Sequence, residues 1–348
     1  MFKYLLSFVL FIFMFIPAVV GSASLSQTIK IIQVHSYDLQ HPCTYPQIIG
    51  FNKKINSLDG RGYKIITKMY YMDAKTKNTS YKQQEEVSKK LIQYIKDQKP
   101  DYVFVTDDVA FEHVGIPAAT LGFKVLAAGL NKQIQSYVLD KTITTQALKN
   151  LYACEEYIHL DDIFYIFEKT RFKPFKWYIL HDETETSYYM MENYEKELIS
   201  KGDVIPISIN SVNDLEDFLD SIKDQRKSVL VLTLQSIYAK NSKTKKISKD
   251  EFIKIIFNNN TKHLELSANM LFSKFGVSIS SGPDFEDMGN KCASYIIDQV
   301  IPRGWKPNVT QPITKTAVNK QRLKELKFDK IMDVNTKQIK IFDEYQNI

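Results

Sequence analysis

Acidic and amide side chains follow two apolar segments of the sequence, at positions where they could meet around a ligand. Asp107 and Asp108 come directly after the apolar segment 102–106, and Asn131 follows the apolar segment 124–130. The carboxyl ends of strands in an open parallel sheet lie at one edge, which is where ligands bind. We therefore expect these side chains at the rim of one cleft. The alternative is that the aspartates only cap the following helix, although one cap needs only one residue.

Other predicted strands also end in polar residues. These residues are Ser36, Tyr37 and Asp38 after the predicted strand 29–35, Asp182, Thr184 and Glu185 after the predicted strand 176–181, and Gln235 after the predicted strand 228–234. Loops are polar because they are solvated, so any single one of these residues could lie at the surface without a role in ligand binding. Together with their aromatic neighbours, however, the set favours a site that buries a small polar ligand with an apolar body.

The segment after residue 181 suggests what such a ligand could carry. Thr184 or Thr186 could cap the helix predicted over 186–201, and the N–H groups of its first turn could bind a carboxylate. The acidic side chains nearby favour an amine instead. Carboxylates on one side of the cleft and a helix N-terminus on the other would suit a zwitterion, such as an amino acid.

Alternating strands and helices must position these residues. Strands are predicted over 29–35, 63–71, 102–106 and 124–130, and again over 176–181, 204–209 and 228–234, with helices over 45–58, 80–97, 161–171, 186–201, 212–223 and 283–301 and an edge strand near 339–341. Ser211 with Asp214 predicts a capping box. This alternation is typical of parallel sheets covered by helices on both faces. We predict an α/β fold with two doubly wound, Rossmann-like lobes joined by a multi-strand hinge.

The N-terminal sequence and the chain length predict a signal peptide followed by two lobes. Lys3, the apolar run 5–16 and the small residues Gly21-Ser22-Ala23 predict a signal peptide over residues 1–23, and therefore a periplasmic or other extracytoplasmic protein. An uncleaved N-terminal anchor is the alternative. The remaining length suits two lobes. We expect residues 24–147 plus about 280–308 in the first lobe, and 148–279 plus the tail 309–348 in the second.

Composition argues against several classes of protein. The formal net charge is +6, with lysines spread among acids, so we expect no binding to nucleic acid. No spacing of histidine or cysteine predicts a metal site, and no motif predicts a cofactor or a catalytic residue. The three cysteines, Cys43, Cys154 and Cys292, allow at most one disulfide, and Cys43 belongs beside the expected cleft.

Several of these segments together resemble a known family. The segments are Val34-His35-Ser36-Tyr37, Tyr71-Met72-Asp73-Ala74-Lys75, Lys99-Pro100-Asp101, Thr106-Asp107-Asp108-Val109-Ala110-Phe111, Ala128-Gly129-Leu130-Asn131, His181-Asp182-Glu183-Thr184-Glu185-Thr186, 276–282 and Ala317-Val318-Asn319. They are similar to the type I periplasmic binding proteins, and more narrowly to the substrate-binding family of ABC transporters with members that take up aromatic amino acids. The sequence departs from that pattern at Pro42-Cys43-Thr44-Tyr45, Ser280-Ser281-Gly282 and Ala153-Cys154-Glu155-Glu156.

The resemblance implies an exported solute-binding protein that closes two lobes around a small ligand and delivers it to an ABC permease. The expected contacts are the nine residues already named at the strand ends, from Ser36 to Glu185, and we expect a monomer without cofactor. A membrane histidine kinase is the alternative partner, because the same fold also serves in sensing. Two alternatives belong to other classes of protein. One is a secreted enzyme with Asp107 or Asp108 as general base, and the other is a structural partner that binds no ligand.

Overall fold

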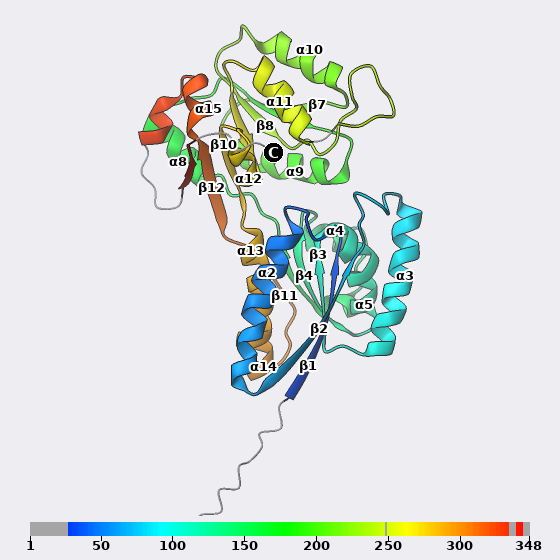
Figure 1. Ribbon diagram of the computed structural model, residues 1–348. Coiled ribbons are helices and arrows are strands. Elements are labelled where there is room, and N and C mark those ends of the chain that lie inside the picture. The colour runs from blue at the N-terminus through cyan, green and yellow to red at the C-terminus, as the bar shows by residue number, and fades with distance from the viewer. Residues whose placement is uncertain (1–26, 248, 334–338, 344–348) are drawn as a thin grey trace, which may run out of the picture.

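The protein consists of two α/β lobes stacked end to end (Figure 1). The structure is a computed structural model that describes residues 27–247, 249–333 and 339–343. The predicted signal peptide lies outside these residues. Within the part that is described, no helix is long and apolar enough to span a membrane.

The first lobe is built on a six-stranded parallel sheet. Its order is β11 (Asn308–Thr310), β5 (Leu151–Glu155), β4 (Lys124–Leu130), β3 (Tyr102–Thr106), β1 (Gln27–His35) and β2 (Tyr63–Tyr71). The strands β3 and β4 are almost continuously apolar, as strands covered on both faces are, and β1 is buried without interruption from Ile31 to His35. Strand β2 alternates between half-buried and exposed residues because it lies at the edge.

The second lobe is built on a seven-stranded sheet. Its order is β13 (Ile339–Phe342), β12 (Thr314–Asn319), β10 (Ile279–Pro283), β9 (Leu264–Ser267), β8 (Val229–Leu232), β6 (Trp177–His181) and β7 (Val204–Ser208). All neighbours are parallel except β10 and β12. The predicted edge strand near residue 340 is confirmed as β13.

Helices cover both faces of each sheet. In the first lobe they are α2 (Thr44–Ile55), α3 (Tyr81–Gln98), α4 (Asp107–Ala110), α5 (Ile116–Thr120), α6 (Ile134–Leu139), α7 (Thr145–Leu148), α13 (Phe285–Ser294) and α14 (Ile301–Arg303), with η1 (Asn56–Arg61), η2 (Phe111–Gly115) and η3 (Tyr295–Val300). In the second they are α8 (Asp161–Thr170), α9 (Glu185–Leu198), α10 (Val212–Ile222), α11 (Lys249–Asn259), α12 (Leu271–Lys274), α15 (Lys320–Glu325) and η4 (Asp329–Asp333). The two-lobed, doubly wound α/β architecture predicted from the sequence is confirmed.

Local signals set several helix ends. The predicted capping box at Ser211 and Asp214 is present at the start of α10. Ser80 and Gln83 form another capping box at the start of α3. The helix predicted from Pro283 begins only at Phe285, because Pro283 still belongs to β10.

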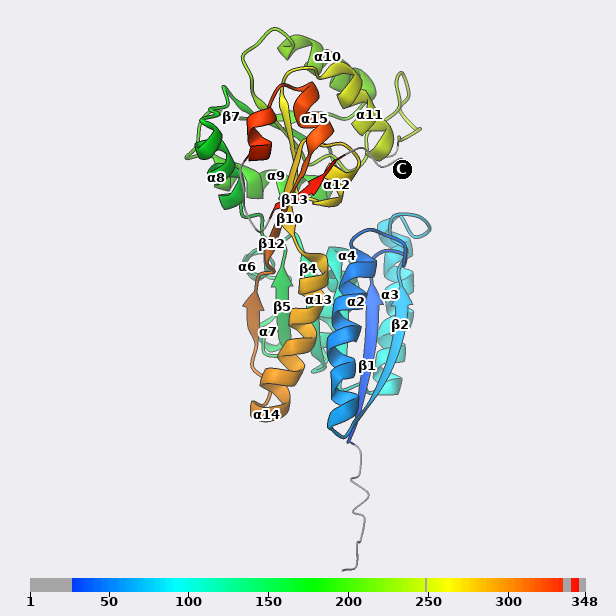
Figure 2. The ribbon, with the colours of Figure 1, turned by 60° about the vertical axis from the view of Figure 1, so that its left-hand side comes forward.

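The chain passes between the lobes at three places. It leaves the first sheet after β5 and returns directly from β10 into α13, and it leaves again between β11 and β12. Figure 2 shows β10 and β12 together at this junction. The first lobe was expected to end at residue 147 and to resume near 280, whereas the structure places β5 in the first sheet and β10 in the second. The tail expected to start the second lobe at 309 begins in the first sheet, as part of β11.

Helices α2 and α13 lie side by side on one face of the first sheet, in closer contact than most helix pairs (Figure 1). A Cβ atom added at Gly289 would lie 2.0 Å from the backbone oxygen of Gln47, and one at Gly50 would lie 1.9 Å from that of Glu286. The two backbones therefore touch where each helix has glycine. Since α13 follows β10, this contact holds the end of the hinge against the first lobe.

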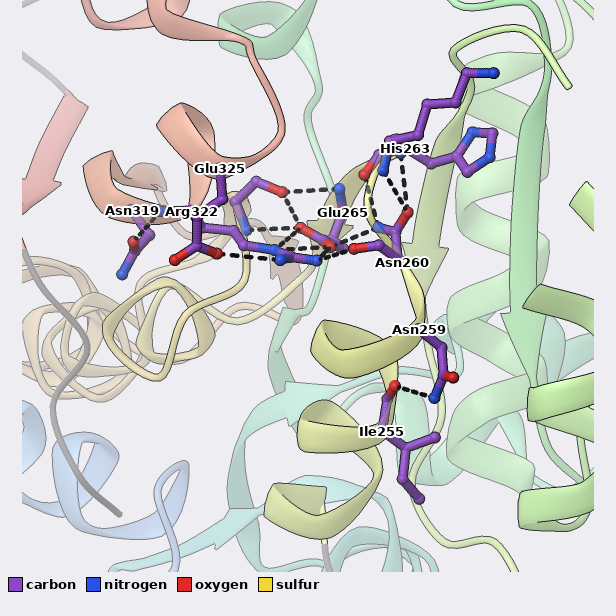
Figure 3. A network of polar contacts seen from close by, with 10 residues as sticks. Ile255, Asn259, Asn260, His263, Glu265, Asn319, Arg322 and Glu325 are labelled. Atoms are coloured by element: carbon purple, nitrogen blue, oxygen red, sulfur yellow. Dashed lines mark hydrogen bonds and ion pairs between the residues drawn. The ribbon is translucent and has the colours of Figure 1, made fainter. Parts of the chain in front are cut away.

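A buried ion pair fixes the C-terminal helix in the second lobe (Figure 3). Arg322 of α15 donates from Nη2 to Oε1 of Glu265 at 2.5 Å and to the backbone oxygen of Asn260 at 2.7 Å. Glu265 also accepts from Asn260 Nδ2 at 2.6 Å and from the Ser278 hydroxyl. Both charges are thus satisfied by hydrogen bonds, which a buried pair requires. Because α15 follows β12, the pair ties this hinge strand to β9.

Replacing Gly289 with alanine should weaken the fold. The new methyl group meets the backbone of α2, which cannot rotate away, so we expect the free energy of unfolding to fall by roughly 1–3 kcal/mol. Gly60→Ala is the matched control, since nothing lies within 4 Å of a Cβ atom at that glycine. Urea unfolding followed by circular dichroism would measure both. Equal stability of the Gly289 and Gly60 variants would contradict the close helix contact.

Candidate functional site

A cleft lies between the lobes, at the carboxyl ends of their parallel strands. The space between the atoms of this cleft, counted together with the open solvent at its mouth, is about 540 Å³. The first lobe lines it with Tyr37, His41, Cys43, Lys75, Asp107, Asn131 and Glu156, and the second lobe lines it with Thr186, Met190, Leu232, Gln235, Ser267, Ala268, Asn269 and Phe272. Phe285, the first residue of α13, completes the lining beside the hinge. Both lobes therefore contribute polar and apolar groups to one cavity, as ligand sites require.

Three of the nine expected contacts line this cleft. Tyr37 follows β1, Asp107 follows β3 and Asn131 follows β4. They come together because these strands are neighbours in the parallel sheet. Cys43, which the sequence places beside the cleft, also lines it.

Ser36 and Asp38 flank Tyr37 but hold its loop. The buried Ser36 hydroxyl donates to the Thr106 carbonyl oxygen and accepts from the Ala110 N–H, both at 2.7 Å. Asp38 Oδ1 accepts from the Gln40 N–H at 2.9 Å in a local turn. The structure thus places these two predicted site residues next to the cleft and outside its lining.

Asp108 organises the loop that presents Asn131. Its carboxylate accepts from Asn131 Nδ2 at 2.9 Å and from the backbone N–H groups of Asn131 and Lys132 at 3.2 Å each. Burial raises the pKa of Asp108, and these hydrogen bonds oppose that shift. Asp108 therefore positions a cleft residue and lies behind the lining.

Asp182 and Thr184 play a similar part in the second lobe. Asp182 is buried and accepts from the N–H groups of Thr184, Gln235 and Ser236. Thr184 caps α9 by accepting from the Ser187 N–H. These contacts present Thr186 and Gln235 to the cleft, while Asp182 and Thr184 stay outside the lining.

Glu185 lies at the mouth of the cleft on α9, outside its lining, and is exposed. It accepts from the Tyr189 hydroxyl at 3.0 Å. Across the gap, the Lys132 ammonium group of the first lobe is 5.8 Å from the centre of the Tyr189 ring and 2.8 Å from Asp140 Oδ2. The negative charge of Glu185 also faces Asp108 and contributes to its raised pKa. At this rim of the cleft, Lys132 of the first lobe is attracted to Tyr189 of the second, whereas Glu185 of the second lobe repels Asp108 of the first.

Asp107 is the most unusual residue in the cleft. Its backbone has φ of 64°, in the left-handed region that residues other than glycine rarely adopt. Burial raises the pKa of its carboxyl to about 7, and the Asp108 charge acts in the same direction while Lys75 opposes it. Its Oδ2 atom is buried and has no hydrogen-bond partner among the described residues. Strain and an unsatisfied buried group occurring together are features of functional sites.

Gly129 makes room for this carboxylate. With φ of 76° it adopts a conformation suited to glycine, and a Cβ atom there would lie 2.4 Å from Gln47 Nε2 and 3.1 Å from Asp107 Oδ1. Gln47 comes from α2, the helix that touches α13. The Asp107 side chain is therefore held between the sheet and α2.

An aromatic ring and a cation form the neighbouring wall. The Lys75 ammonium group lies 4.1 Å from the centre of the Tyr37 ring and 3.4 Å from His41 Nε2. The Tyr37 and His41 rings are 4.3 Å apart. Lys75 thus has partners within the protein while it lines the cleft.

Sequence reasoning did not select most of the second-lobe lining. Gln235 was noted at the end of a predicted strand and Thr186 as a possible helix cap, but neither was among the nine expected contacts. Ser267 ends β9 and Ala268 and Asn269 follow it, and Glu156 follows β5; neither of these two strands was predicted. Among the described residues, no cluster of three or more histidine, cysteine or acidic side chains could hold a metal ion.

Known structures share this architecture. A substrate-binding protein with adhesive properties from Clostridium difficile, in its ligand-free open form, has a TM-score of 0.65 and 15% identity, covering 90% of this chain and 99% of that one. The chain has the type I periplasmic binding protein fold. An ABC domain in complex with L-Trp from Streptococcus pneumoniae has a TM-score of 0.61 and 14% identity, over 90% of this chain and 100% of that one.

The type I periplasmic binding protein fold is also found in regulators. A transcriptional regulator in complex with cellobiose has a TM-score of 0.51 and 12% identity, covering 85% of each chain. No protein-family model matches the sequence, and no curated protein sequence matches it. At these identities the similarity shows the fold alone, so the function must be argued from the cleft.

Replacing Asp107 with asparagine should stabilise the protein at high pH. The folded state holds a proton on Asp107 up to about pH 7, whereas the unfolded chain releases it near pH 4, so wild-type stability falls as pH rises between these values. Asparagine stays neutral and tolerates the left-handed backbone. We expect a gain of roughly 2–4 kcal/mol at pH 8 and little change at pH 4. Urea unfolding at both pH values would measure this, with Asp38→Asn as the control, and an equal change at both would contradict it.

Proposed function

We propose that this protein is an exported solute-binding protein that closes its lobes around a small ligand and delivers it to an ABC permease. The observation that carries the proposal is the cleft itself, which is lined from both lobes and combines the unsatisfied Asp107 carboxylate with aromatic and aliphatic side chains. A cleft that joins a few placed polar groups to apolar surface suits a small organic molecule such as an amino acid.

The hinge supports closure as the mode of binding. Three short connections cross between the lobes. Each links an element packed in the first lobe to an element packed in the second lobe. Such a junction allows the lobes to rotate as rigid bodies, while a ligand that touches both favours the closed form. Closure would bring Thr186 and Gln235 toward Asp107 and Asn131, and it would exclude water from the ligand.

Export and the permease are the further parts of the proposal. The N-terminal sequence supports export, and the resemblance of the strand-end segments to ABC substrate-binding proteins supports delivery to a permease. A membrane histidine kinase would use the same closure. Genes for a permease and an ATPase beside this gene would favour transport, and a kinase gene in their place would favour sensing.

The cysteines provide a direct test of ligand binding. Cys43 lines the cleft, whereas Cys154 and Cys292 are fully buried. Burial raises the pKa of the Cys154 thiol to about 12 and that of Cys292 well above its usual value, so neither should react. We expect slow alkylation of a single thiol, Cys43, and slower alkylation still when a ligand fills the cleft.

The experiment is a screen of amino acids, amines, organic acids, sugars and nucleosides, with alkylation read by intact-protein mass spectrometry. Cys43→Ser is the control and should remove the labelled species. A folded protein whose Cys43 is protected by none of these compounds would count against a solute-binding function. A compound that is chemically changed during the assay would point to an enzyme instead.

A further inference from the structure

We infer that a lysine-rich hairpin of the second lobe, residues 238–247, binds the anionic headgroups of a membrane and turns the mouth of the cleft toward it. The inference goes beyond the proposed function, and it rests on that function only in placing the protein beside a membrane. It is carried by the charge of the hairpin, by its fixed shape and by its position at the open side of the cleft.

The hairpin is the exception to the even spread of charge along the chain. Residues 235–249 contain five lysines, at positions 240, 243, 245, 246 and 249, and no acidic residue. Lys243, Lys245 and Lys246 are exposed, and no ion pair between described residues involves any of them. Three ammonium groups within four residues are therefore available to an anionic surface.

The backbone of the hairpin is held in one shape. Its two arms pair through an antiparallel bridge between Tyr238 and Lys246, and the Ala239 N–H donates to the backbone oxygen of Lys245 at 2.7 Å. At the turn, the Ser242 hydroxyl accepts from the Lys245 N–H at 2.9 Å. A loop that is ordered before it binds loses little conformational entropy on binding.

The hairpin lies at the cleft end of the second lobe, on the side away from the hinge. Tyr238 donates its N–H to the Asn210 oxygen at 2.8 Å and accepts from the Val212 N–H at 2.9 Å, between the end of β7 and the start of α10. Strand β7 is the edge of the second sheet opposite to the hinge strands β10 and β12, and Gln235 lines the cleft three residues before Tyr238. The hairpin, yellow-green in Figure 1, therefore flanks the mouth of the cleft.

This position brings the hairpin to the membrane in the proposed function. A protein that passes its ligand to a membrane permease turns the mouth of its cleft toward the membrane. A group of lysines beside the mouth would then meet the headgroups first, and their attraction to anionic lipid would favour this orientation over others.

Acidic side chains near the hairpin leave its charge in place. At the start of α10, Asp214 accepts N–H groups in the capping box and Glu216 pairs with Lys240 at 2.5 Å. Asp217 and Asp220 lie on later turns of this helix, which leads away from the cleft end. The acidic helix α9 packs against the other face of the sheet. The three exposed lysines thus form a basic surface of their own.

The surface of the hairpin suits lipid headgroups better than a folded partner. Its tip, Asn241-Ser242-Lys243-Thr244, has no apolar side chain, whereas specific protein interfaces are centred on buried apolar or aromatic groups. Lysine side chains are long and can reach headgroups in many arrangements. Each lysine near an anionic membrane surface strengthens binding about five-fold, and salt screens the attraction.

Sedimentation with lipid vesicles tests the inference on the protein in the N-terminal form that the cells produce. We expect tighter binding to vesicles of mixed anionic and zwitterionic lipid than to zwitterionic vesicles, with the difference lost at high salt. Changing Lys243, Lys245 and Lys246 together to glutamine should weaken binding to the anionic vesicles at least about ten-fold. Equal binding to the two kinds of vesicle, or unchanged binding by this variant, would overturn the inference.

A second triple variant is the matched control. Lys53, Lys90 and Lys96 are exposed lysines in the parts of α2 and α3 that lead away from the cleft. Changing these three to glutamine gives the same net charge as the hairpin variant, and binding to anionic vesicles should stay as in the wild type. An equal loss in both variants would mean that only total charge matters, and would overturn the role of the hairpin.

A polarity-sensitive fluorophore can report which surface meets the lipid. It would be attached through Thr244→Cys at the hairpin tip or through Leu121→Cys, an exposed position before β4 at the far end of the first lobe, each in a Cys43→Ser background. We expect anionic vesicles to change the emission at position 244 alone. An equal change at both positions would contradict an oriented hairpin.

Ligand binding is measured separately, so the two proposals can fail separately. The cleft lining does not include residues 238–247, so a ligand should protect Cys43 equally in the wild type and in the hairpin variant. Absence of vesicle binding, with Cys43 still protected by a ligand, would overturn this inference and leave solute binding standing. Protection of Cys43 by no compound would count against solute binding, while the vesicle measurements would still decide the role of the hairpin.

Discussion

The contact between α2 and α13 is the constraint on which the arrangement of the site depends. Gly50 and Gly289 let the two helix backbones touch, at a point where any side chain would force them apart. Helix α13 begins where β10 leaves the hinge, and its first residue, Phe285, lines the cleft. Helix α2 carries Gln47, whose side chain lies beside Asp107 and Gly129. One helix contact thus fixes the hinge, the apolar wall and the acidic floor relative to one another.

In the second lobe, a buried ion pair attaches the C-terminal segments to the rest of the sheet. The buried pair of Glu265 and Arg322 ties β9 to α15, and through α15 to β12. A buried pair of this kind contributes less to stability than to the choice of one arrangement, since apolar residues could fill the same space. Here it specifies how β12, a strand that continues from the hinge, sits against the rest of the lobe.

Much of the fold could be predicted from the sequence because the strands of a doubly wound sheet are short apolar runs between amphipathic helices. Strands β2 and β3 were predicted with the bounds that the structure has. Strand β5 was not, because Leu151–Glu155 is short and ends in cysteine and glutamate, although its side chains are buried in the cores on both faces of the sheet. The lobe boundary near residue 147 was therefore drawn before a strand that belongs to the first sheet.

The site could be predicted only in part, for a related reason. The rule that ligands bind at the carboxyl ends of parallel strands led to Tyr37, Asp107 and Asn131, which line the cleft. The same rule cannot separate a residue that faces the cleft from one that holds its loop, as Asp108 and Asp182 do. That distinction depends on hydrogen bonds with the loops that follow other strands, and these partners are not neighbours in the sequence.

Closure of the lobes around a ligand is the central claim, and the distance between the two rims tests it most directly. Leu39 of the first lobe and Tyr188 of α9 are both exposed and could carry spin labels as cysteines in a Cys43→Ser background. Double electron–electron resonance should give a broad distance distribution without ligand, and a shorter, narrower one with a compound that protects Cys43 in the wild type. An unchanged distribution, with the compound shown to be bound, would contradict the account.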